Sequence, residues 1–219
     1  MNILLDPLPE TVNIGGAEYP IETDFRTSIL FELLIRDGEY EGSEMILKGL
    51  DLYFHNSIPA DLVEAANQMI WFYLCGKAEN TQTGSKGEPD GDPGAESDDI
   101  SGADGSDYSF EHDADYIYAA FFSAYGIDLA EIPYMHWWKF RALMRSLPQD
   151  CEFSRILGYR GIKITSKMSE SDREFYRRMK RIYALPLPEK EQERHNKLVE
   201  ILKNGGDPSA LLGLEGGDR

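Results

Sequence analysis

The chain has few cysteines and basic residues, and it lacks a long apolar run. Its two cysteines, Cys75 and Cys151, cannot build a disulfide framework, which favours a reducing compartment. The chain has 22 Lys and Arg residues but 39 Asp and Glu residues. The resulting net charge of −17 disfavours nucleic acid and membrane surfaces as partners. The longest apolar run, Met69–Cys75, is too short to span a bilayer. The N-terminal residues do not resemble a secretory signal, so we expect a soluble intracellular protein.

The common signatures of catalytic and metal sites are also missing. The sequence contains no HExxH, CxxC, GxSxG, GxxxxGKS/T or GxGxxG motif, and its four histidines lie on separate expected elements. Residues 111–115 gather potential metal ligands, but on a helix only Glu111 and Asp115 would share a face. Acidic residues in a first helical turn also complement the helix dipole, which is our preferred interpretation. We therefore expect no enzymatic activity, cofactor or metal, with a metal-dependent enzyme using His112 as an alternative.

Composition divides the chain into segments. Residues 1–75 carry 3 basic and 13 acidic side chains, whereas residues 151–219 carry 14 and 11. Residues 76–107 hold seven glycines, two prolines and no aromatic residue, so they cannot bury enough apolar surface to offset the entropy of folding. We expect a disordered acidic linker there. It would join an N-terminal module over 1–75 to a helical C-terminal module over 108–186, and a terminal helix and flexible tail would follow over 187–219.

The N-terminal module is predicted to be a β-hairpin followed by three helices. Two short runs containing Val, Ile and Tyr, Thr11–Ile14 and Ala17–Ile21, flank a Gly-Gly pair that can adopt the positive φ angles of a tight turn. Apolar residues then recur at helical spacing over residues 23–37. A second helix is expected to start at Ser43 and a third at Pro59.

The C-terminal module is predicted to be entirely helical, so the protein as a whole is expected to be mainly α. Ser169 and Asp172 form a capping box that marks one helix start. The expected helices share apolar residues at helical spacing and cover residues 107–126 (starting at Asp107 or Ser109), 133–147, 153–157, 169–185 and 189–203.

Residues 134–147 show two apolar or aromatic sides on a helical wheel. One side is a core stripe that includes Trp137 and Phe140. An adjoining side carries four residues of the kinds enriched in protein-interface hot spots, namely Tyr134, Trp138, Arg141 and Arg145. We interpret these four, the aromatic–arginine set, as a candidate partner-binding surface. The alternative is an internal arrangement in which an Arg stacks on a Trp where another helix crosses.

A cluster of positive charge lies on the helix expected near residues 170–183. The cluster, called the basic face below, consists of Arg173, Arg177, Arg178, Lys180 and Arg181. Because the rest of the chain is strongly acidic, we expect this face to dock against the acidic N-terminal module or an acidic partner. A solvated helix face and a nucleic-acid strip are the alternatives, and the net charge disfavours the second of them.

Several sequence blocks resemble a known family. They are TVNIGGAEYPIETDFR, DYSFEHDADYIYAAFFSAYGIDL, PYMHWWKFRALMRSLP, FSRILGYRGI and EFYRRMKRIYALP. These blocks are similar to the bacteriophage Gp-fifteen (Gp15) family, and the WWKF block is the most specific of them. The resemblance covers residues 1–75 and 108–186.

The resemblance implies a biological role but no catalytic activity. Members of the family are encoded by phages and prophages of Gram-positive bacteria, typically beside the tape-measure gene, and have no established catalytic residues. We therefore expect a tail-assembly chaperone that binds the tape-measure protein or other tail proteins, with self-association left open. It would act in the host cytoplasm and be absent from the mature virion. The alternative is a structural tail component that is retained in the virion.

Overall fold

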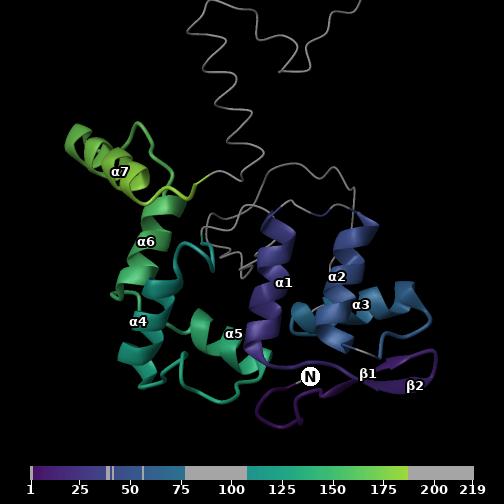
Figure 1. The fold of residues 1–219 in the computed structure, drawn as a ribbon. Coiled ribbons are helices and arrows are strands. Elements are labelled where there is room, and N and C mark those ends of the chain that lie inside the picture. The colour runs from purple at the N-terminus through teal and green to yellow at the C-terminus, as the bar shows by residue number, and fades with distance from the viewer. Residues whose placement is uncertain (1, 38–39, 41, 56, 77–107, 187–219) are drawn as a thin grey trace, which may run out of the picture.

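The computed structural model describes residues 2–37, 40, 42–55, 57–76 and 108–186 (Figure 1). Within these residues the chain forms one antiparallel hairpin and seven helices, which confirms a mainly helical protein with an N-terminal hairpin. None of the seven helices in this part of the chain is long and apolar enough to cross a membrane. The predicted linker beyond Gly76 and the predicted terminal helix and tail lie outside the described residues.

The hairpin forms around the predicted glycine turn. Strand β1 (Thr11–Ile14) pairs with β2 (Ala17–Pro20) across the dipeptide Gly15–Gly16. The two glycines have φ angles of 61° and 82°, which side chains disfavour, so they form the tight turn that the sequence predicted. Val12 and Ile14 point to the core and are each 3% exposed, while the alternate β1 residues face solvent.

Three helices complete the N-terminal half: α1 (Phe25–Asp37), α2 (Ser43–Phe54) and α3 (Leu62–Tyr73). The third starts later than the predicted Pro59, because the Asp61 carboxylate accepts a hydrogen bond from the Glu64 amide and caps the helix there. A Cβ at Gly49 would lie 2.6 Å from the Phe31 ring, so this glycine lets α2 approach α1 closely.

Four helices form the C-terminal half: α4 (Ala114–Tyr125), α5 (Trp137–Arg145), α6 (Glu152–Gly161) and α7 (Glu170–Ile182). Helices α4 and α5 start later than predicted, after Asp113 and after His136, and α6 continues past the predicted end at residue 157. The start of α7 is confirmed, since the Ser169 hydroxyl accepts the Asp172 amide at 3.0 Å.

The two halves share one hydrophobic core, a point that the sequence left open. The ring of Phe25 on α1 stacks on Phe140 of α5 at a centroid distance of 4.8 Å. The ring of Tyr73 on α3 stacks on Trp137 of α5 at 5.7 Å. All four side chains belong to the same buried cluster, and α1 packs against α5 (Figure 1). The predicted modules are therefore in direct contact through their apolar interiors.

Candidate functional site

Backbone hydrogen bonds join the segment before α5 to the N-terminal half. The Phe25 amide donates to the Met135 carbonyl at 2.9 Å, and the Trp137 amide donates to the Thr23 carbonyl at 2.8 Å. These bonds hold the chain before α5 in an extended bridge to the start of α1. A helix beginning at Pro133, as the sequence predicted, would withdraw the same backbone groups from that bridge.

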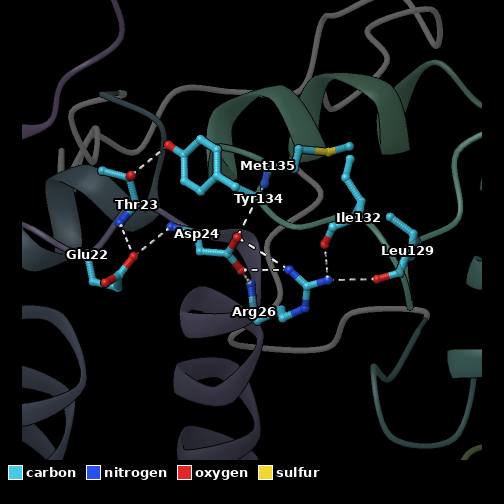
Figure 2. Close-up of polar contacts among 8 residues, drawn as sticks. All are labelled: Glu22, Thr23, Asp24, Arg26, Leu129, Ile132, Tyr134 and Met135. Carbon is cyan, nitrogen blue, oxygen red and sulfur yellow. Dashed lines mark hydrogen bonds and ion pairs between the residues drawn. The ribbon is translucent and has the colours of Figure 1, made fainter.

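Side chains reinforce the same junction (Figure 2). Nη2 of Arg26 donates to the carbonyls of Leu129 and Ile132, at 3.0 and 2.7 Å. Nη1 of Arg26 lies 3.3 Å from Oδ1 of Asp24, and Oδ2 of Asp24 accepts the Met135 amide at 3.2 Å. The N-terminal half therefore supplies a charged pair that satisfies backbone groups of the C-terminal half. Because charge-assisted hydrogen bonds are the stronger kind, this pair fixes how the halves meet.

The two tryptophans at the start of α5 lie inside the fold. The indole Nε1 of Trp137 donates to the Tyr73 carbonyl, and that of Trp138 donates to the Phe72 carbonyl, both at 2.8 Å. These carbonyls are at the end of α3, where helical partners run out. Trp137 is 0% exposed and Trp138 6%. Trp138 thus takes the internal position that the sequence left open as an alternative to a binding surface.

Arg141 also lies inside, among buried polar groups. Its guanidinium carbon is 5.2 Å from the centroid of the Trp137 ring, and its Nη1 donates to the Tyr108 hydroxyl at 3.4 Å. Nearby, Oε2 of the buried Glu32 accepts the Tyr73 hydroxyl at 2.9 Å. Burial raises the pKa of the Glu32 carboxyl, while the Tyr73 hydrogen bond and the charge of Arg141 oppose that shift. The charge of Arg141 therefore acts on a buried carboxyl group, and its guanidinium lies over a Trp ring, as the internal alternative from the sequence requires.

Tyr134 and Arg145 are the two members of the aromatic–arginine set at the surface. Tyr134 is 49% exposed, with its hydroxyl 2.8 Å from Oγ1 of Thr23, and Arg145 is exposed in the last turn of α5. The four residues do not form one exposed face, because α3 and Tyr108 cover the first turns of α5. Partner binding stays a prediction for the exposed pair.

His136 caps α5 as a neutral imidazole. Its Nδ1 accepts the Trp138 amide at 3.1 Å, and its Nε2 lies 3.1 Å from the Pro9 carbonyl, which can only accept. The proton must therefore be on Nε2, since Nδ1 uses its lone pair as the helix cap. Burial lowers the pKa of this histidine. The cap ties the N-terminal segment to the same junction.

The basic face lies on α7, and α7 packs against α6 on the side away from the N-terminal helices (Figure 1). Arg177, Arg178 and Arg181 are exposed, whereas Arg173 and Lys180 are half-buried. The Lys180 ammonium donates to an α6 carbonyl at 2.6 Å. The exposed arginines therefore point to solvent in this chain, and docking of an acidic surface on them stays a prediction.

The sequence did not predict one buried ion pair. Both carboxylate oxygens of Asp113 bind the Arg160 guanidinium, at 2.7 and 2.8 Å, and the side chains are 1% and 10% exposed. The pair joins the start of α4 to α6 across 47 positions of sequence, so no local pattern marks it. With both oxygens engaged, Asp113 is not available as a metal ligand beside His112. Among the described residues, no group of three or more His, Cys, Asp or Glu side chains could hold a metal ion.

Large apolar side chains are exposed on several helices, which helical spacing alone did not reveal. A scattered exposed Leu or Ile is ordinary, but pairs on one helix face are candidate contact surfaces. The exposed pairs and triplets are Ile46 and Leu47 on α2, Leu62, Val63 and Ile70 on α3, Tyr118 and Phe122 on α4, and Phe175 and Ile182 on α7.

Comparison with known proteins identifies a family. A family model described as Bacteriophage Gp15 protein matches residues 4–185, which takes in the hairpin, all seven helices of the described part and the junction between the halves. No curated protein and no solved structure matches the chain significantly. The family match confirms the resemblance of the WWKF and neighbouring blocks, and the chain belongs to the bacteriophage Gp15 protein family.

Proposed function

We propose that this protein acts in phage tail morphogenesis as a non-enzymatic assembly chaperone that binds the tape-measure protein. Membership of the Gp15 family, over residues 4–185, is the observation that carries the proposal. The family resemblance implies a gene beside that of the tape-measure protein, a long helical chain with apolar stripes. We further propose that the protein works in the cytoplasm of the bacterial host and is absent from the mature virion.

Two physical properties support this role. A holder of a long apolar client needs apolar contact surface, and the exposed side chains of α2 and α4 offer it. It must also keep the complex dispersed, which a net charge of −17 favours through mutual repulsion. The alternative metal site around His112 is less favoured, because both carboxylate oxygens of Asp113 bind the Arg160 guanidinium.

The contact predicted near α5 can be tested with its exposed residues. A tape-measure protein from the same phage or prophage would be co-expressed with this chain and captured through a tag. We expect Tyr134→Ala and Arg145→Glu to reduce capture, and Lys139→Glu, exposed on another side of α5, to leave it unchanged. Equal capture by all variants would remove this surface from the proposal. Variants of Trp138 or Arg141 would disturb the core and are unsuitable.

The function itself has a separate test. If the wild-type chain captures no tape-measure protein, the chaperone role is wrong. Mass spectrometry of purified phage particles distinguishes it from a structural role, because a chaperone should be absent from finished particles. Recovery of the chain there in stoichiometric amounts would replace the proposal with a structural tail component.

A further inference from the structure

Helix α7 presents an exposed face in which apolar and basic residues alternate. Phe175, Arg178 and Ile182 are spaced by three and four residues and so lie along one side of the helix, with Arg181 beside them. Phe175 is 46% exposed and Ile182 56%, and no residue of α7 is buried. These four residues are called the α7 face. The positive charge continues into α6, since residues 151–186 carry nine basic and four acidic side chains.

A second exposed apolar face lies on α3, in surroundings of opposite charge. Val63 and Ile70 are 73% and 38% exposed, and Leu62 beside them is 44% exposed. Val63 and Ile70 are seven residues apart, which is two helical turns and the same separation as Phe175 and Ile182 on α7. These three α3 residues are called the α3 face. It belongs to residues 1–75, which carry 3 basic and 13 acidic side chains, and an acidic residue, Asp61, caps this helix.

The two faces are complementary but lie far apart in one molecule. Helix α7 packs on α6 in the C-terminal half, while α3 packs on α2 and β1 in the N-terminal half, and Figure 1 shows them at opposite sides of the described part. Pairing of two α7 faces would bring arginines together, and pairing of two α3 faces would bring acidic surfaces together. Both arrangements are disfavoured by like-charge repulsion. The favourable contact is α7 on α3, which requires a second copy.

We infer that copies of this chain associate head to tail, with the α7 face of one copy docked on the α3 face of the next. The apolar residues two turns apart on each helix form the centre of the contact, and the arginines meet the acidic rim. The contact uses different surfaces on the two copies, so it leaves one face of each kind free at the ends and can extend to longer chains. This association does not depend on binding of the tape-measure protein.

A complementation experiment on the full chain tests this geometry. The α7 variant is Phe175→Ser with Ile182→Ser, and the α3 variant is Val63→Arg. Light scattering after gel filtration should show wild-type mass rising above the monomer with concentration, and should show each variant alone as a monomer. An equimolar mixture of the two variants should form a 1:1 dimer and nothing longer, because one variant keeps an intact α3 face and the other an intact α7 face.

Matched controls place equivalent changes outside the two faces. Phe122→Ser and Ala119→Arg, both at exposed positions of α4, should leave association unchanged. Association of the wild type should also weaken with added salt, since charges at an exposed rim are screened.

Several results would overturn the inference. A wild-type chain that stays monomeric at every concentration would show that the α7 and α3 faces do not pair between copies. An α3 variant that still self-associates would indicate a symmetric α7 contact. Two monomeric variants that fail to form a dimer when mixed would exclude the head-to-tail arrangement.

Discussion

Helices α5 and α7 carry the same kinds of side chain and lie in opposite surroundings. Both combine aromatic residues with arginines, yet Trp137 and Phe140 of α5 are 0% exposed, whereas α7 has no buried residue. Helix α5 is enclosed because α1, α3 and the segment around Tyr108 reach it, while α7 packs on α6 at the edge of the described part. An amphipathic pattern therefore indicates that a helix has an apolar side. Whether that side lies in the core or at the surface depends on the elements that pack against the helix.

The sharpest test of this comparison removes one large side chain from each helix. We expect Trp137→Ala to lower the free energy of unfolding by about 3–5 kcal/mol, because it leaves a cavity and deprives the Tyr73 carbonyl of a donor. The matched change Phe175→Ala should cost less, about 1–2 kcal/mol, because Phe175 is 46% exposed and loses mainly its edge contact with the Tyr159 ring. Urea denaturation followed by fluorescence or circular dichroism measures both. Similar losses would show that α7 is as much a part of the core as α5.

The buried ion pair gives the next largest effect. Asp113→Asn removes the carboxylate that neutralises Arg160 and should cost about 3 kcal/mol, since it leaves a largely buried guanidinium without that partner. The control Asp115→Asn lies on the same helix at an exposed position and should stay within about 0.5 kcal/mol of the wild type. Equal urea midpoints for the two variants would mean that the pair does not hold α4 and α6 together.

The junction between the halves should be more tolerant. Arg26→Met deletes the donor to the Leu129 and Ile132 carbonyls and should cost about 1.5 kcal/mol, at the low end for charged hydrogen bonds because Arg26 is 41% exposed. Hydrogen exchange should speed up in the segment before α5. Lys48→Met, on α2, removes a charge away from the junction and serves as the control. Unchanged exchange in Arg26→Met would show that the backbone bridge suffices.

The smallest effect is a pH dependence at the start of α5. Because burial lowers the pKa of His136 below its value of 6.5 in the unfolded chain, the unfolded state binds more protons below that pH. Stability from the neutral imidazole is therefore present at higher pH and is lost as the pH falls below 6.5. His136→Asn keeps an acceptor for the Trp138 amide and should flatten this loss in urea midpoints taken on either side of pH 6.5. An unchanged pH profile would assign the dependence to other groups.

Two local signals in the sequence predicted local structure correctly, whereas a third, Pro59, placed the start of α3 too early. The Gly15–Gly16 pair predicted the hairpin turn because few other residues tolerate its φ angles, and Ser169 predicted the start of α7 because its hydroxyl caps an amide three residues on. The starts of α4 and α5 were missed. Asp113 and His136, the residues that precede these helices, are held by partners from distant positions, namely Arg160 and the Pro9 carbonyl.

The helical class, the hairpin, the charge contrast between the two ends and the family could all be predicted before the fold was known, since they depend on composition, short-range periodicity and specific blocks such as WWKF. Which amphipathic faces are covered depends on how the helices pack together. Trp138 and Arg141 became internal and Tyr134 and Arg145 stayed outside because burial depends on which distant helix crosses at that point. A helical wheel describes one helix at a time, whereas a core is made where several helices meet.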